Sequence, residues 1–112
     1  KCNKSKIEFS NDIFLSNISK DILSSADAVI TDTWESMGEK TDQKNLIELQ
    51  KYRVTQNLMD MTPSECLFMH CLPANRSQEV EAQVIDGPSS RVWQEAENRL
   101  HIQKQILIEC FN

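Results

Sequence analysis

Two short apolar segments, each stopped by polar residues, constrain the fold of this chain more than any other feature. The first is Ala28–Thr31, which stops at Asp32, and the second is Cys66–Met69, which stops at His70 and is followed by Pro73. Short continuous runs of apolar and β-branched residues are typical of parallel strands covered on both faces. Proline cannot donate a hydrogen bond to a sheet ladder, so the second strand must end before it. We therefore predict two parallel strands whose carboxyl ends carry polar side chains.

Helical periodicity surrounds these two segments. One helix is predicted after the capping residues Ser10 and Asn11, with Phe14, Ile18 and Ile22 on one face, and a second contains Leu46, Leu49 and Tyr52. A short third helix is predicted over about Thr55–Met61 and is ended by Pro63. A closing helix is predicted from Glu95, and one of its faces contains Ala96, Leu100, Gln103, Leu107 and Phe111. Lys6–Phe9 alternates like a strand, and Asp86-Gly87-Pro88 marks a turn in a linker over residues 74–91. This order predicts an α/β fold whose parallel sheet is flanked by helices.

Composition allows one small domain and argues against several classes of protein. The 112 residues are 39% hydrophobic and 26% charged, close to globular values, and the net charge of -5 is spread along the chain. Without a basic cluster to displace phosphate counterions, nucleic-acid binding is not predicted. No apolar run approaches the roughly 20 residues that cross a bilayer, so no membrane segment is predicted. The four cysteines form no close CxxC pair, which indicates reduced thiols in a cytoplasmic protein.

Polar groups follow both predicted strands. Asp32 begins the segment Asp32–Gly38, which contains Ser36 and Met37, and Cys71 lies in a second polar segment. Ligands of open α/β sheets bind beyond the carboxyl ends of the strands. Because parallel strands end at the same edge, we expect Asp32 and Cys71 to lie close enough to share a ligand. A carboxylate there can pair with an amine, while a hydroxyl and backbone groups hold the other end of a small zwitterion.

Local pattern leaves other interpretations of these residues open. Asp32 and Ser36 also suit caps of the loop and of the helix that follows it. Cys71 suits a nucleophile or a polarising thiol near a cation, but a buried, unreactive cysteine fits the same pattern. Cys66, His70 and Cys71 lack the spacing of zinc ligands, so no metal site is predicted.

Arg99 is the third candidate. It follows the acidic first turn Glu95–Asn98 of the predicted closing helix. A guanidinium at this place can hold an oxyanion such as phosphate with a fork of N–H groups. The alternative is an ion pair with Glu95 one turn back, which contributes only about 0.3–0.5 kcal/mol.

Taken together, three segments resemble, in order and separation, the motifs of ornithine carbamoyltransferases. They are Asp32–Gly38 (Asp-Thr-Trp-Glu-Ser-Met-Gly), His70–Pro73 (His-Cys-Leu-Pro) and Glu95–Arg99 (Glu-Ala-Glu-Asn-Arg). The likeness runs from about Ile7 to the C-terminus and is similar to bacterial members. It implies that residues 1–112 form part of a C-terminal, Rossmann-like ornithine-binding domain that includes the closing helix.

The resemblance also implies a reaction. Members of the family transfer a carbamoyl group from carbamoyl phosphate to the side-chain amine of L-ornithine and release L-citrulline and phosphate, without a metal or cofactor, as in arginine biosynthesis. By this resemblance, Asp32 binds and orients the ornithine amine. Ser36 and the backbone of Met37 hold the amino-acid end of the same substrate.

The remaining motif residues are implied to face the second substrate. Cys71 lies beside the ornithine amine and, together with Leu72, faces carbamoyl phosphate. Arg99 helps to bind carbamoyl phosphate and polarises it, because its charge meets the charge that develops on the carbamoyl oxygen and on the leaving phosphate. The Leu72-Pro73 bond is expected to be cis, as it is in the family.

The family's carbamoyl-phosphate-binding half, with a Ser-Thr-Arg-Thr loop and a His-Pro motif, has no counterpart in these residues. The chain also opens on Lys1 instead of methionine, so we expect it to begin inside a longer polypeptide. That parent is expected to be a homotrimer, and the fragment alone is expected to be inactive. The alternatives are a carbamoyltransferase for a related amine such as acetylornithine or putrescine, a non-catalytic module that binds an amino acid, and a truncated product without function.

Overall fold

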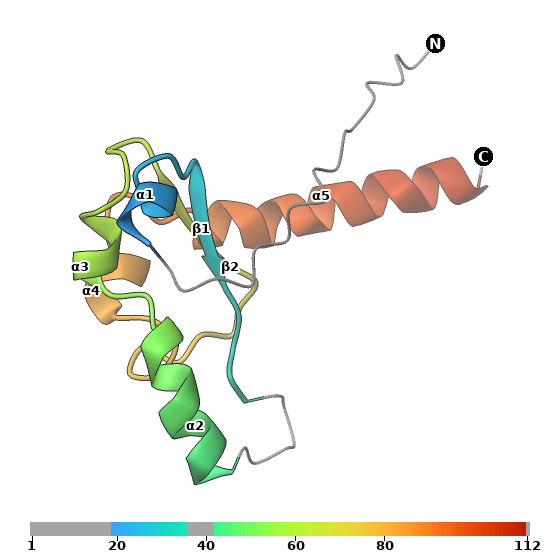
Figure 1. Ribbon diagram of the computed structural model, residues 1–112. Coiled ribbons are helices and arrows are strands. Elements are labelled where there is room, and N and C mark those ends of the chain that lie inside the picture. The colour runs from blue at the N-terminus through green and yellow to red at the C-terminus, as the bar shows by residue number, and fades with distance from the viewer. Residues whose placement is uncertain (1–18, 36–41, 112) are drawn as a thin grey trace.

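A parallel sheet lies at the centre of the fold. The computed structural model describes residues 19–35 and 42–111, and within them strand β1 (Ala28–Thr31) pairs in parallel with β2 (Leu67–His70) (Figure 1). Ala28 lies opposite Leu67, and Thr31 lies opposite His70. The first strand has the predicted bounds, whereas the second is shifted by one residue because His70 still pairs with Thr31. The prediction of an α/β fold with a parallel sheet flanked by helices is confirmed.

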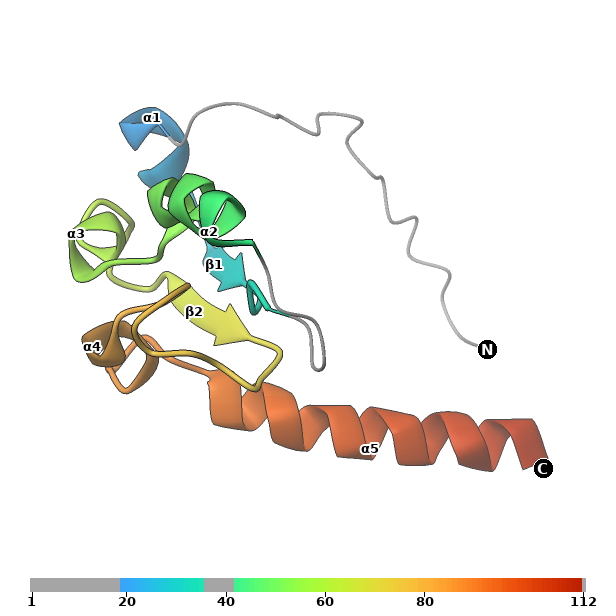
Figure 2. The same cartoon turned by 90° about the horizontal axis from the view of Figure 1, so that it is seen from below.

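The other edge of β2 is also bonded. The N–H of Phe68 donates to the carbonyl of Ser89 at 2.9 Å, and the N–H of Arg91 donates to the carbonyl of Phe68 at 2.8 Å. The long helix α5 (Val92–Phe111) begins at the next residue. Figure 2 shows β2 between β1 and the start of α5. β2 is therefore the central strand. The residues that follow it, beginning with Cys71, lie between the end of β1 and the first turns of α5.

Short helices connect these elements. They are α1 (Lys20–Leu23), α2 (Gln43–Leu49) continued by the 3-10 turn η1 (Gln50–Tyr52), α3 (Gln56–Met59) and α4 (Ala82–Ile85). Thr55 caps α3, because its hydroxyl accepts from the N–H of Leu58 at 3.2 Å, as expected for a residue at this position. The predicted helices near Leu46 and after Thr55 are confirmed. α4 was not predicted, since four residues inside a linker carry too little periodicity to be recognised.

The core surrounds β2. Its buried residues are Val54, Met59, Cys66, Phe68, Val80, Val84, Ile85 and Val92. Phe68 is fully buried in the middle of the strand. Val54 and Val80 form an isolated parallel bridge, which ties the segment before α3 to the segment before α4. The core thus fixes the strand that carries the residues following His70.

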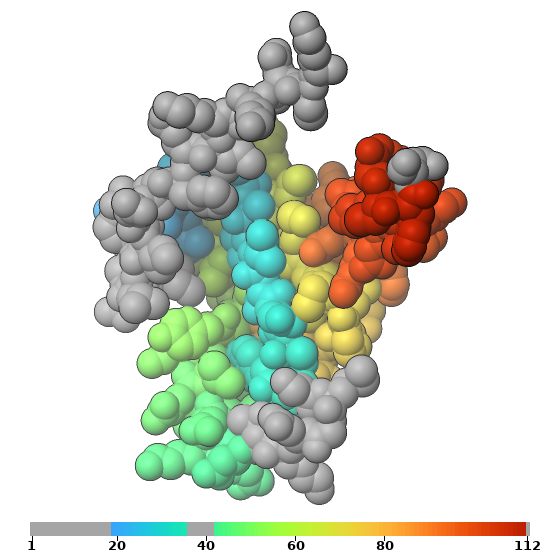
Figure 3. Space-filling view, turned by 90° about the vertical axis from the view of Figure 1, so that its right-hand side faces the viewer, coloured from blue at the N-terminus to red at the C-terminus, as the bar shows by residue number. Residues whose placement is uncertain are grey.

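Two apolar surfaces are more exposed than the sequence indicated. Ile30 is 66% exposed, so β1 is not covered on both faces, and Figure 3 shows residues of β1 at the molecular surface. The closing helix is confirmed and begins at Val92, three residues earlier than predicted. Only Val92 of α5 is buried, while Leu100 and Leu107 are more than half exposed. No helix in the described part of the chain has the length and apolar character needed to span a membrane.

The predicted strand Lys6–Phe9 and most of the predicted helix after Asn11 lie outside the described residues. The end of that helix is described as α1, in which Leu23 is buried. Cys66, Cys71 and Cys110 are free thiols. The prediction of reduced cysteines in a cytoplasmic protein stays a prediction.

Candidate functional site

Asp32 and Cys71 meet at the carboxyl ends of the two strands. Each residue follows its strand directly, and Thr31 and His70 are paired across the sheet. The Cys71 thiol donates a hydrogen bond to Asp32 Oδ1 at 2.8 Å. Asp32 Oδ1 also accepts from the N–H of Thr33 at 2.7 Å, so the carboxylate orders its own loop as well. The expected proximity of Asp32 and Cys71 is confirmed.

This contact changes the acidity of both groups. The hydrogen bond from Cys71, followed by the one from Thr33, holds the pKa of the Asp32 carboxyl below its ordinary value. The same hydrogen bond raises the pKa of the Cys71 thiol, with further contributions from partial desolvation and from the charges of Asp32 and Glu95. At neutral pH the pair is therefore a carboxylate and a neutral thiol. Cys71 is exposed, unlike the buried cysteine that the local pattern also allowed, and its thiol donates a hydrogen bond to Asp32.

The raised pKa of Cys71 gives a testable pH dependence. We expect Asp32→Asn to lower the pKa of Cys71, because an amide removes both the charged acceptor and its repulsion of the thiolate. Alkylation by iodoacetamide, followed peptide by peptide with mass spectrometry, should then reach half its maximal rate at a lower pH than in the unaltered chain. Exposed Cys110 is the internal control, and its pH profile should not move. An unchanged Cys71 profile in the variant would contradict the assigned cause.

His70 shapes the backbone after β2. Its imidazole is fully buried, and Nδ1 accepts a hydrogen bond from the N–H of Leu72 at 2.9 Å. The neutral ring therefore carries its proton on Nε2, which lies 3.3 Å from Glu79 Oε1. The two atoms are in polar contact, although Nε2 has no hydrogen-bond partner among the described residues. His70 thus holds Leu72 in the left-handed region, at φ 53°, which an isolated leucine rarely adopts.

Glu79 is the buried acid that sequence reasoning missed. Its side chain is fully buried, and Oε1 also accepts a hydrogen bond from the N–H of Asn75. Within the described residues, Oε2 has no hydrogen-bond partner. Glu79 therefore connects the His70 ring to the loop that follows Pro73. Nothing local marks this residue in the sequence, because its partner lies nine positions away and its segment resembles an ordinary polar linker.

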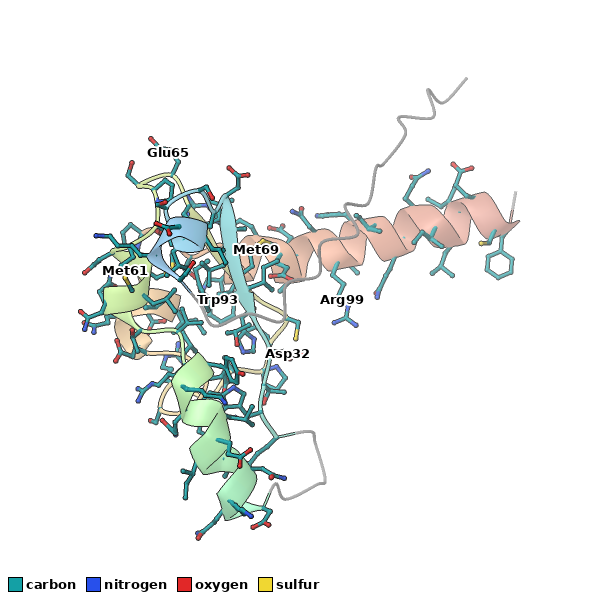
Figure 4. The ribbon with its side chains drawn as sticks, viewed as in Figure 1. Asp32, Met61, Glu65, Met69, Trp93 and Arg99 are labelled. Atoms are coloured by element: carbon teal, nitrogen blue, oxygen red, sulfur yellow. The ribbon has the colours of Figure 1, made fainter. Side chains whose placement is uncertain are left out.

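A pocket opens between the end of β2 and one face of α5. Its volume is about 530 Å³, and its lining includes Met69, Cys71, Glu95, Asn98, Arg99 and Ile102. Figure 4 shows Arg99 projecting from α5 on the side where Asp32 lies. Among the described residues, Arg99 has no hydrogen-bond or ion-pair partner, so the alternative of an ion pair with Glu95 is wrong. Its guanidinium is free to meet an anion in the pocket.

Glu95 bonds to the strand instead. Glu95 Oε2 accepts a hydrogen bond from the backbone N–H of His70 at 3.1 Å. The sequence singled out Glu95 only as a neighbour of Arg99 on the helix. Its actual partner is 25 positions earlier in the chain, and this pairing follows only from the way α5 crosses the end of β2.

The other predicted site residues have different outcomes. Ser36 and Met37 lie outside the described residues, so their predicted contact with an amino-acid end stays a prediction. Leu72 is half-buried against the core, and its N–H is engaged by His70. The expected cis bond between Leu72 and Pro73 is confirmed.

Comparison with known proteins shows to which family the chain belongs. The family model described as "Aspartate/ornithine carbamoyltransferase, Asp/Orn binding domain" matches residues 1–110. The chain belongs to this family. The resemblance drawn from the three motifs is thereby confirmed for the carbamoyltransferase family as a whole.

Individual members of the carbamoyltransferase family agree in both sequence and structure. The chain is 49% identical over 92 residues to the ornithine carbamoyltransferase of Caulobacter vibrioides, which covers 82% of this chain and 30% of that protein. It is 57% identical over 83 residues to the Nitrosococcus oceani enzyme, covering 73% of this chain and 27% of that one. The solved ornithine carbamoyltransferase from Pyrococcus furiosus superposes with a TM-score of 0.70 at 40% identity, over 79% of this chain and 28% of that one. The chain therefore spans about three tenths of the length of these relatives.

Proposed function

We propose that this chain forms part of the ornithine side of an ornithine carbamoyltransferase. The observation that carries the proposal is the 2.8 Å contact between Cys71 Sγ and Asp32 Oδ1, beside a pocket lined by Cys71 and Arg99. In the proposed reaction, the nitrogen of the ornithine side-chain amine bonds to the carbonyl carbon of carbamoyl phosphate and loses a proton. The bond from that carbon to the phosphate oxygen breaks, which yields L-citrulline and phosphate.

The charges of the site match these two substrates. The Cys71 thiol and the Thr33 N–H donate to the Asp32 carboxylate and lower its pKa further, so the carboxylate is held in place to pair with an amine and orient it. Arg99 places a permanent positive charge in the same pocket as Cys71, where carbamoyl oxygen and leaving phosphate both gain negative charge. We assign amine orientation to Asp32 and Cys71, and carbamoyl phosphate binding to Arg99, Cys71 and Leu72.

The proposal extends to parts of the protein beyond the described site. Ser36 and the backbone of Met37 are proposed to hold the amino-acid end of ornithine. The parent protein is proposed to be a cytoplasmic homotrimer in arginine biosynthesis that needs neither a metal nor a cofactor. Because the chain spans about three tenths of its relatives, the carbamoyl-phosphate half must come from other residues.

A chimaera tests this function directly. We expect a protein in which this chain replaces the matching part of the Caulobacter vibrioides enzyme to form citrulline from ornithine and carbamoyl phosphate. The same chimaera should turn over putrescine and acetylornithine far more slowly, and the isolated chain should form no citrulline. Colorimetric citrulline detection and calorimetric titration of the isolated chain with ornithine provide the measurements. A folded chimaera without activity, or micromolar ornithine binding by the isolated chain, would instead favour a non-catalytic binding module.

A further inference from the structure

Helix α5 is held to the sheet by few contacts. Of its 20 residues, only Val92 is buried, and the helix leaves the body of the protein beyond its first turns (Figure 1). Before the helix, the Arg91 N–H is bonded to Phe68. Inside the helix, the hydrogen bond from the His70 N–H to Glu95 is the side-chain bond that joins α5 to β2 among the described residues. The direction of α5 therefore depends on two points, the burial of Val92 and the acceptor on Glu95.

Arg99 lies one helical turn beyond this second point. A rise of about 1.5 Å per residue places it about 6 Å farther along the helix axis. A small rotation of α5 about Val92 would thus move the guanidinium relative to Cys71, which follows the strand residue that donates to Glu95. Glu95 and Arg99 line the same pocket, together with Cys71.

We propose that Glu95 is a positioning residue, which sets the place of Arg99 in the pocket that it shares with Cys71 by accepting the hydrogen bond from the His70 backbone. Glu95 needs no contact with a substrate for this role. A hydrogen bond to a carboxylate is stronger than one to a neutral acceptor and is correspondingly better at fixing the helix. The expected effect of Glu95 on enzyme kinetics rests on the proposed function of the site, whereas its effect on the position of α5 does not.

Three variants distinguish the positioning of α5 by Glu95 from an effect of its charge and from a general loss of stability. Glu95→Ala removes the acceptor, and Glu95→Gln keeps an oxygen that can accept from the His70 N–H but removes the charge. Glu97→Ala is the matched control, because Glu97 is an acid on the same helix with a side chain that is 73% exposed. Its carboxylate lies 3.9 Å from the ring of His101 on α5 itself, so this contact does not join the helix to the sheet.

In the chimaera, we expect Glu95→Ala to lower kcat/KM for carbamoyl phosphate by about 10- to 100-fold, the range for a catalytic group displaced by about 1 Å. The KM for ornithine should change by less than about 3-fold, because Asp32 does not depend on α5, and the Gln variant should recover most of the loss. Glu97→Ala should leave all constants unchanged. Equal losses in the Ala and Gln variants, or no loss in either, would overturn the proposal.

A second measurement on the isolated chain is independent of activity. The His70 amide should exchange with solvent about 10-fold faster or more in Glu95→Ala, as expected for loss of a hydrogen bond to a charged acceptor, and should stay protected in Glu95→Gln. If the chimaera makes no citrulline while this exchange pattern holds, the proposed function fails and the positioning of α5 by Glu95 stands. Unchanged His70 exchange in Glu95→Ala would overturn the positioning role even in an active enzyme.

Discussion

Replacing either member of the Asp32–Cys71 pair should lower citrulline formation by about 100-fold or more, within the range for groups that orient a reacting amine and its proton. Cys71→Ala removes the thiol that donates to the Asp32 carboxylate and orients it, and Asp32→Asn removes the charge that pairs with the amine. Because the two side chains share one 2.8 Å hydrogen bond, they act as a unit. The double variant should therefore be little worse than the more damaging single variant. Steady-state kinetics of the chimaera with ornithine and carbamoyl phosphate measures all three.

Cys110→Ala is the control for the two single variants and the double variant. Cys110 is an exposed thiol at the far end of α5, so its removal should leave kcat/KM unchanged. Near-normal activity in both single variants would remove Asp32 and Cys71 from the proposed roles. Fully additive losses in the double variant would show instead that the two residues act in separate steps.

The largest effect on stability is expected at Phe68. Phe68→Ala should lower the free energy of unfolding by about 3–5 kcal/mol, the usual cost of truncating a buried phenylalanine to alanine. The side chain is fully buried in the central strand, and its backbone bonds to residues 89 and 91. Folded domains are stable by only about 5–15 kcal/mol, so this change removes a large part of the margin. Urea denaturation followed by circular dichroism provides the measurement.

Ile30→Ala is the matched control on the neighbouring strand. Ile30 is 66% exposed, so its truncation should change stability by less than about 0.5 kcal/mol. Phe68→Leu keeps most of the apolar volume and should give an intermediate loss in case the alanine variant does not fold. Equal losses at Phe68 and Ile30 would contradict the assignment of the core to β2.

The strands were predictable because each is a continuous apolar run with a sharp polar stop. Ala28–Thr31 was predicted to the residue, and the helix that closes the chain was predicted because it contains no glycine or proline. The short helix α4 was not predictable, because its two buried residues, Val84 and Ile85, pack only after the chain folds back onto α3. Exposure was predicted least well. Periodicity identifies the apolar face of α5 but does not show whether anything covers it.

The candidate site also contains features that the sequence predicted and features that it did not. The proximity of Asp32 and Cys71 followed from a general property of parallel sheets, so the sequence was sufficient to predict it. The roles of His70, Glu79 and Glu95 depend on contacts between segments that are nine and 25 positions apart. Such pairs carry no periodic pattern, and each acidic residue alone resembles a solvent-exposed one. Long-range packing, which a single sequence does not record, was needed to find them.

The pairing of Thr31 with His70 has a consequence for how such proteins tolerate change over evolution. Residues 32–66 join the two strands, and inserting or deleting residues within such a connection alters its closure entropy only slowly, by about 0.6 kcal/mol for each doubling in length. A slip of β1 by one residue against β2 would instead turn alternate side chains to opposite faces and separate Asp32 from Cys71. Lineages can therefore vary the length of the connection at positions outside its core and its proposed binding residues, while a single-residue insertion or deletion within either four-residue strand should be eliminated by selection.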